Sequence, residues 1–99
     1  MNTKLHLLMS TGKTAQRHMM AAFAPGDQVL LVDQGTGLVT WPERLQALQE
    51  IAGEALAVAR ADLDARGLLR TGQDRGLRIV DDQEWVAAVT AHRHVLSWT

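Results

Sequence analysis

The chain has 99 residues, of which 46% are hydrophobic and 21% are charged, so it suits one folded domain and is too apolar to remain disordered. Its 10 Lys and Arg side chains and 11 Asp and Glu side chains give a formal net charge of -1, which argues against electrostatic binding to nucleic acid or acidic lipid. The sequence contains no cysteine, which excludes disulfides, thiolate metal sites, thiol nucleophiles and persulfide chemistry on this chain.

The N-terminal segment lacks the pattern of an export signal. Its apolar run is interrupted by His6 and is shorter than the hydrophobic region of a secretory signal. No stretch approaches the roughly 18 apolar residues that a membrane span needs. We therefore expect a cytoplasmic protein with no membrane partner, folded as a single domain over residues 1–99.

The first third of the sequence predicts two strands separated by a helix. The apolar run Leu5–Met9 predicts a strand that ends in a turn. An apolar stripe at helical spacing then predicts a helix that Thr14 caps and Pro25 ends. The members of that stripe are Ala15, His18, Met19, Ala22 and Phe23. The continuous run Gln28–Val32 predicts a strand covered on both faces, which is typical of a parallel sheet.

The middle of the chain allows two different predictions. After a loop predicted at Gly35–Gly37, Thr40 and Glu43 form a capping-box pattern that begins a helix. Helix propensity alone would continue one helix from Arg44 through Ala65. Because globular helices are usually about 11 to 12 residues long, we favour dividing this interval. The division gives a helix over 44–52, a strand over Ala55–Ala59 and a short helix over Asp62–Arg66.

The last third predicts a strand, a helix and a further strand. The glycine-rich stretch Gly67–Gly76 is predicted to be a surface connection, and Leu77–Val80 a short strand. Asp81 and Glu84 form a second capping-box pattern, and Val95–Thr99 predicts a last strand or a docked tail. One face of the intervening helix carries Trp85, Ala88, Val89 and His92. The alternation of strands and helices predicts a small three-layer α/β fold with a mainly parallel sheet flanked by helices.

One motif points to a different class of function, a small nucleotide-binding or phosphotransfer protein. Gly12, Lys13 and Thr14 lie between a predicted strand and a predicted helix, and they resemble the end of a phosphate-binding loop. The first glycine of such a loop should lie five residues before Gly12, where this sequence has Leu7. A turn with a surface lysine is the simpler interpretation, so we rank this function second.

The remaining polar clusters predict no catalytic, metal or cofactor site. His92 and His94 could join the acidic pair at 81–82 around a metal ion, but their spacing points the two histidines in different directions. Ser10 and Ser97 are the only serines, and neither lies in the motif of an activated nucleophile. The glycines at 35–37 lack the third glycine of a dinucleotide-binding loop.

Three tryptophans are many for a core of this size. Trp is enriched in protein interfaces, so a partner surface and a core-packed ring are equally good interpretations of these residues. Trp98 lies near the end of the sequence, where chains usually fray. We expect Trp98 to be tied down, either as a core residue or as an interface anchor.

Four segments, taken in order, resemble the DsrH/TusB family over nearly the whole chain. The patterns D-L-x-A-R-G-L and V-L-S-W carry most of the resemblance. The segments are Leu5–His6, Gly26–Val32, Asp62–Leu68 and His92–Trp98. The family implies a small α/β fold of the DsrEFH type with a mainly parallel sheet, which supports the strand over Ala55–Ala59.

The resemblance also implies a role in sulfur relay. Family members join DsrE/TusD-like and DsrF/TusC-like subunits in heterohexamers that pass persulfide sulfur, in some cases to a TusE/DsrC-like acceptor. The sulfur goes to 2-thiouridine at tRNA wobble positions or into dissimilatory sulfur oxidation. Some relatives carry a cysteine at or near Met20, where a thioether cannot form a persulfide. The resemblance implies a non-catalytic docking subunit without cofactor or direct nucleic acid contact, whose partner interface includes His18, Met19, Met20, Gly35 and Trp98.

Overall fold

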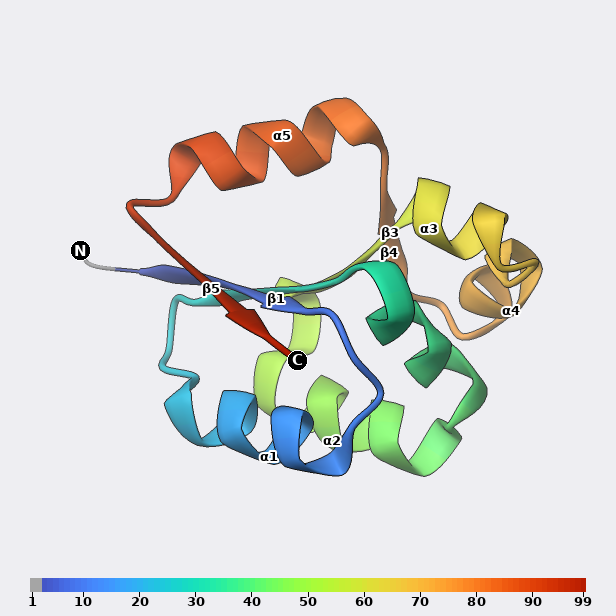
Figure 1. The fold of residues 1–99 in the computed structure, drawn as a ribbon, viewed down its shortest axis with the longest axis horizontal. Coiled ribbons are helices and arrows are strands. Elements are labelled where there is room, and N and C mark those ends of the chain that lie inside the picture. Colours follow the sequence, from blue (N-terminus) through green and yellow to red (C-terminus); the bar gives the residue numbers. More distant parts are fainter. Residues whose placement is uncertain (1–2) are drawn as a thin grey trace.

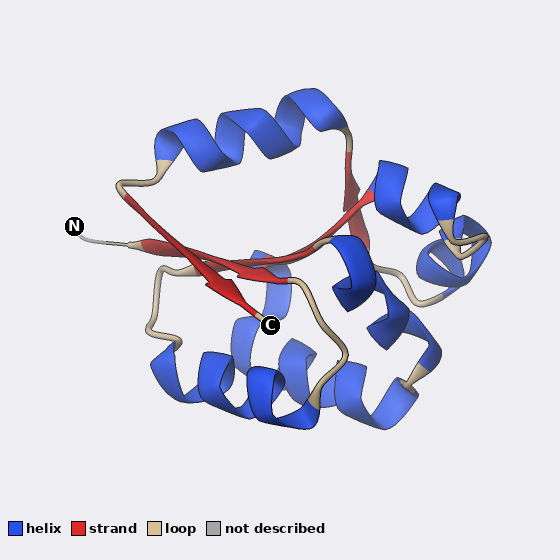
Figure 2. Ribbon diagram, in the orientation of Figure 1, coloured by secondary structure: helices blue, strands red, loops and turns tan. Residues whose placement is uncertain are grey.

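The computed structural model describes residues 3–99 as one five-stranded sheet with helices on both faces (Figures 1 and 2). The strands are β1 (Lys4–Leu8), β2 (Gln28–Leu31), β3 (Leu56–Ala59), β4 (Arg78–Val80) and β5 (His94–Trp98). The α-helices are α1 (Lys13–Ala22), α2 (Pro42–Ala52), α3 (Arg60–Ala65), α4 (Leu69–Asp74) and α5 (Asp82–Ala91). Two 3-10 helices, η1 (Asp33–Thr40) and η2 (Gly53–Ala55), complete the secondary structure.

Every strand pair in the sheet is parallel. The strand order is β4-β3-β2-β1-β5, so the first and the last strand of the sequence are neighbours. In the register, Leu7 of β1 lies between Leu30 of β2 and Ser97 of β5. Parallel neighbours require crossover connections, which the helices supply. The parallel sheet predicted from the run Gln28–Val32 is therefore confirmed.

Alternate residues of each strand enter two separate cores, one on each face of the sheet. On one face the strands pack against α1, η1, α2 and α3, which lie below the sheet and at its right in Figure 1. The other face packs against α5, which crosses it alone. Leu8, for example, belongs to the first core, and Leu7 belongs to the second.

The structure confirms the division of the long Ala- and Leu-rich interval. Strand β3 lies at the centre of that interval, and all four of its residues are buried. A helix running through the interval would remove β3, which links β2 and β4 in the sheet. The second capping box is also confirmed: Glu84 N donates to Asp81 Oδ1 over 2.8 Å, and Asp81 N donates to Glu84 Oε1 over 3.2 Å.

Two predicted helix caps are wrong. Thr14 lies inside α1, whose N-cap residue is Gly12, and no side chain caps this helix. Thr40 does not cap α2, because its hydroxyl donates to the Gly37 carbonyl oxygen over 2.7 Å at the end of η1. The local partner inside the 3-10 helix thus replaces the capping bond that the sequence pattern predicted.

Two predicted loops are helical instead. The Gly35–Gly37 segment belongs to η1, and the Gly67–Gly76 stretch contains α4. In α4, a Cβ atom on Gly72 would lie 2.8 Å from Leu63 Cδ1, so the glycine allows α4 to pack closely on α3. No helix among residues 3–99 combines the length and the apolar character needed to cross a bilayer.

Candidate interaction site

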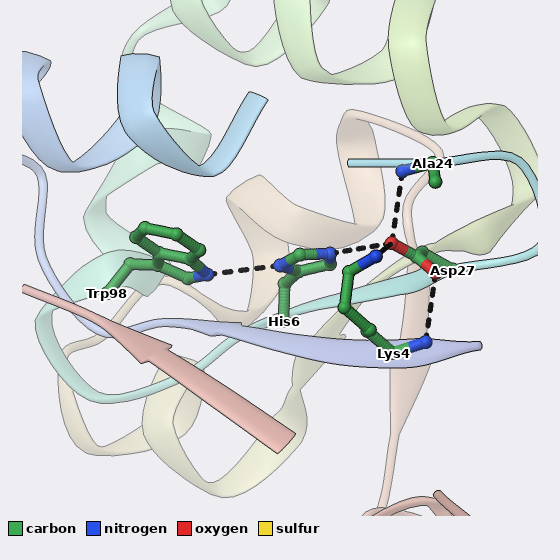
Figure 3. A network of polar contacts seen from close by, with 5 residues as sticks. All are labelled: Lys4, His6, Ala24, Asp27 and Trp98. Atoms are coloured by element: carbon green, nitrogen blue, oxygen red, sulfur yellow. Dashed lines mark hydrogen bonds and ion pairs between the residues drawn. The ribbon is translucent and has the colours of Figure 1, made fainter. Parts of the chain in front are cut away.

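Two buried polar side chains, His6 and Asp27, meet in a network of polar contacts just before β2 (Figure 3). Asp27 Oδ2 accepts hydrogen bonds from His6 Nε2 at 2.9 Å and from the Ala24 amide at 3.0 Å. The Lys4 ammonium lies 3.1 Å from the same oxygen, and the Lys4 amide donates to Oδ1 over 2.9 Å. This network joins the start of β1 to the turn that follows α1.

Trp98 connects this network to β5 and determines which ring nitrogen of His6 carries the hydrogen. The indole Nε1 of Trp98 donates to His6 Nδ1 over 3.1 Å, and an indole nitrogen is a donor only. Nδ1 is therefore the acceptor, so Nε2 carries the hydrogen and donates it to Asp27. The Trp98 carbonyl oxygen also accepts from the Met9 amide over 2.9 Å. The prediction that Trp98 is tied down is confirmed.

The charge of Asp27 is stabilised by its donors. Burial acts to raise the pKa of this carboxyl, but the hydrogen bonds from His6, Lys4 and Ala24 outweigh burial and hold the pKa well below its usual range. His6 is fully buried in the structure, so no substrate can reach its ring. The network suits a structural connection between β1, β2 and β5 rather than acid-base catalysis.

The D-L-x-A-R-G-L segment holds the end of β2. Asp62 Oδ2 accepts from the Asp33 amide over 2.7 Å, and Arg66 Nη2 lies 2.6 Å from Asp33 Oδ1. Leu63 between them is fully buried in the core. Gly67 follows with a φ of 67°, a conformation that favours glycine. The segment therefore fixes the start of η1, which the sequence patterns alone did not indicate.

The five residues expected at a partner interface do not share one surface. His18 is exposed on α1, and Met20 is half-buried on the same helix. Met19 lies in the core with 1% of its surface exposed. Gly35 is buried and packs closely against β1, since a Cβ atom there would lie 1.9 Å from the Leu8 carbonyl oxygen. Trp98 is half-buried against the same core as Met19. Of the five, His18 and Met20 lie on α1 with side chains that are at least partly exposed, and their spacing of two residues points them in different directions.

Met20 borders a groove that the sequence patterns did not reveal. The groove lies between α1 and α2 and encloses about 440 Å³. It is lined by Lys13, Gln16, Arg17, Met20, Glu43, Arg44 and Ala47. The sequence did hold one signal of this groove: a second stripe at helical spacing, beside the apolar one, made of Lys13, Arg17 and Met20.

The β1–α1 loop lacks the geometry of a phosphate-binding loop. Leu7, at the position of the first glycine, lies within β1 and is buried. The Gly12 amide donates to Ser10 Oγ over 2.8 Å, so it is already bonded within the loop. A phosphate cradle needs such amides free to donate to the ligand. This geometry favours a simple turn that presents Lys13.

Residues 3–99 contain no group of three His, Cys, Asp or Glu side chains that could hold a metal ion. His92 Nδ1 lies 2.7 Å from the Ala88 carbonyl oxygen at the end of α5. His92 is the C-cap residue of α5, whereas His94 begins β5, so the two histidines are held by different elements.

Comparison with known families identifies the chain. The family model described as DsrH like protein matches residues 10–95, which is most of the sequence. The chain belongs to the DsrH family. The family resemblance is therefore confirmed, and the family, whose members belong to multi-subunit sulfur-relay complexes, indicates a sulfur-relay subunit. No curated protein matched the sequence.

Proposed function

We propose that this DsrH-family chain is a non-catalytic subunit of a cytoplasmic heterohexamer. Its partners are DsrE/TusD-like and DsrF/TusC-like subunits, which supply the sulfur-carrying cysteine. The complex supports persulfide transfer toward 2-thiouridine in tRNA or into dissimilatory sulfur oxidation, with a TusE/DsrC-like protein as downstream acceptor. The family match supports the sulfur-relay setting, and the composition of the chain supports the non-catalytic role.

One observation carries the non-catalytic assignment: a sulfur-relay subunit here has no cysteine at all. Persulfide transfer needs a thiolate to attack the incoming sulfur, and a methionine thioether has no proton to lose. Met20 is half-buried on α1, at or near the position where the family resemblance places a cysteine. A methionine there offers an adaptable apolar contact instead of a sulfur carrier.

Co-expression with the two neighbouring small subunits, followed by size-exclusion chromatography with light scattering, tests assembly. We expect one complex containing all three chains. His18→Asp combined with Met20→Asp should weaken incorporation of this chain, while Gln73→Ala on the exposed side of α4 should not. A complex of the other two subunits that forms completely and excludes this chain would contradict the proposal.

A reconstituted sulfur-transfer assay tests whether this chain carries sulfur within the complex. The complex is loaded with persulfide, and each chain is analysed by mass spectrometry after alkylation. We expect transferred sulfur on the partners only. In the Met20→Cys variant we expect part of the label on this chain, because α1 then presents a thiol at the interface. An unlabelled variant in an active complex would place α1 away from the relay path.

The family does not distinguish the two branches of sulfur metabolism, but the neighbouring genes do. A tRNA thiolase gene beside this one predicts loss of wobble 2-thiouridine on deletion, measured by nucleoside mass spectrometry. Sulfite reductase genes beside it predict loss of sulfur oxidation instead.

A further inference from the structure

The first turns of α1 and α2 are joined by a pair of reciprocal hydrogen bonds. Gln16 Nε2 donates to the Arg44 carbonyl oxygen, and Arg44 Nε donates to Gln16 Oε1, each over 3.0 Å. In Figure 1 the two helices lie side by side under the sheet. A second hollow, of about 390 Å³, adjoins the groove and is lined by Lys13, Thr40, Trp41, Pro42, Glu43 and Arg44. The two hollows share Lys13, Glu43 and Arg44, so they form one continuous surface, which we call the α1–α2 groove.

The α1–α2 groove is rich in positive charge. Lys13, Arg17 and Arg44 line it, against the single carboxylate of Glu43. None of the three cations forms an ion pair with any carboxylate in the described part of the chain. Both helices also begin at this groove, neither has a side-chain cap, and α1 has no acidic residue in its first turn. The positive end of α1 therefore adds to the charge of the side chains, while Glu43 in the first turn of α2 offsets the positive end of that helix.

Arg44 is held in place but is not fully bonded. Its Nε is engaged by Gln16, while its buried Nη2 has no hydrogen-bond partner among residues 3–99. Arg44 as a whole is half-buried and lines both hollows, so its charge is presented to the groove. A carboxylate is the acceptor that best fits the planar guanidinium group.

The α1–α2 groove also has an apolar component. The Trp41 ring is 53% exposed, and the Arg44 guanidinium carbon lies 5.8 Å from its centre. Met20 and Ala47 line the other end. Trp and Arg are among the residues in which the binding energy of protein interfaces is concentrated.

We propose that the α1–α2 groove docks an acidic segment of a partner protein that carries apolar side chains between its carboxylates. The carboxylates bind Arg44 and Lys13, and the apolar side chains pack on Trp41 and Met20. A nucleotide fits less well, because the adjoining loop offers no phosphate cradle: the Gly12 amide is taken by Ser10. The proposal goes beyond membership of a sulfur-relay complex, since any acidic partner segment of this chemistry would fit.

The full chain is titrated with a short synthetic peptide of glutamates interspersed with leucines, acetylated and amidated. The three tryptophan indole signals in a proton-nitrogen NMR spectrum give the readout. We expect saturable binding that moves the Trp41 signal and leaves the Trp98 signal, which is hydrogen-bonded to His6, in place. The affinity should fall as salt is added, because charges at an exposed groove are screened.

Three variants locate the binding site. Trp41→Ala lacks the indole signal, so its binding is followed by the backbone amide signals of α1, and it should be weaker by about tenfold, which is typical of an interface tryptophan. Arg44→Gln should weaken it by about tenfold or more, because a charge-assisted bond is lost. Lys13→Gln should weaken it a few-fold without touching the Gln16 bonds. Arg70→Gln, an exposed arginine on α4, is the matched control and should bind like the unaltered chain.

Two results would overturn the proposal. One is the absence of binding, or equal binding to a peptide in which lysine replaces glutamate. The other is binding of ATP at Trp41 that is tighter than peptide binding and is lost in Lys13→Gln, which would assign the groove to nucleotides. Assembly into the heterohexamer is measured separately, so failure of peptide binding leaves the proposed function standing.

Discussion

The two faces of the sheet are covered to very different depths. On one face, residues from β1, β2, β3, α1, η1, α2 and α3 form a core in which Leu8, Leu38 and Val58 are completely buried. On the other face only α5 covers the strands, and none of its residues is fully buried (Figure 2). Trp85, Ala88 and Val89 make the contact of α5 with the second core. We call the side with α1, η1, α2 and α3 the thick layer and the side with α5 the thin layer.

This difference separates the part of the chain that sets global stability from the part that opens most easily. Local opening costs least where few apolar side chains are buried. Helix α5 leaves Val86 57% exposed, and the neighbouring strand β5 leaves Val95 and Leu96 more than a third exposed. The segment 82–98 is therefore expected to exchange its amide hydrogens faster than β2 or β3.

Truncating one leucine in the thick layer should have the largest effect. Leu45→Ala removes a side chain with 2% exposure and leaves a cavity, so we expect a loss of about 4 kcal/mol in the free energy of unfolding. Val89→Ala in the thin layer should cost only about 1 kcal/mol. Urea unfolding of both variants measures the difference. Equal losses would show that the two faces contribute alike.

Trp98 links β5 to the thick layer, so its removal should cost about 3 kcal/mol. Trp98→Phe keeps most of the apolar contact and loses only the bond to His6 Nδ1, for a cost of about 1 kcal/mol. Thermal unfolding separates the two variants. A Trp98→Ala chain that melts normally but no longer enters the heterohexamer would make Trp98 an interface anchor instead of a core residue.

Asp27→Asn should cost about 2 kcal/mol near neutral pH, because the His6 and Lys4 donors lose a charged acceptor. The folded pKa of Asp27 lies below its usual value of 3.8, so its contribution is complete above about pH 5 and is lost as the pH falls below about 4. Urea midpoints measured from pH 7 to pH 3 should fall more steeply in the unaltered chain than in the variant. Parallel slopes would contradict this account.

The smallest effect is expected at the start of α5. Asp81→Ala removes the side-chain cap from Glu84 N and should cost about 1 kcal/mol. Because α5 covers the thin layer alone, hydrogen exchange should accelerate in α5 while β2 and β3 stay protected. Uniform acceleration along the chain would show that the thin layer opens only with the whole molecule.

Some strands were predictable because a strand buried on both faces is continuously apolar. Gln28–Leu31, with its apolar run Val29–Leu31, was predicted in this way. Leu56–Ala59 was not, because helix propensity alone would have continued a helix through it; its prediction rested on the usual length of helices and on the family resemblance. The capping box of Asp81 and Glu84 was predictable because both of its hydrogen bonds join residues only three positions apart. Local chemistry therefore predicted β2 and this capping box well.

The wrong cap at Thr40 has a local cause, the hydrogen bond to Gly37, but other errors arose where distant contacts override local preference. Glycine at 72 disfavours a helix in isolation, yet it is retained because a side chain there would meet Leu63 of α3. The Asp27 network was missed because residues that bond to one another in it lie far apart in the sequence, with 92 positions between His6 and Trp98. His6 within an apolar strand was the available signal of a buried polar partner. The α1–α2 groove likewise depends on how two helices meet, which periodicity does not specify.

The strand order also constrains when the sheet can be completed during protein synthesis. Strand β1 is synthesised first, and its outer neighbour β5 is synthesised last, after α5. Until β5 pairs, one hydrogen-bonding edge of β1 is unpaired, and His6 Nδ1 lacks the hydrogen bond from the Trp98 indole. Closing so long a loop is slow relative to local pairing. A nascent chain that stops before residue 94 would therefore expose an unpaired edge of β1, to which strands of other chains can bind. Chaperones that cover this edge until β5 has paired would prevent such aggregation.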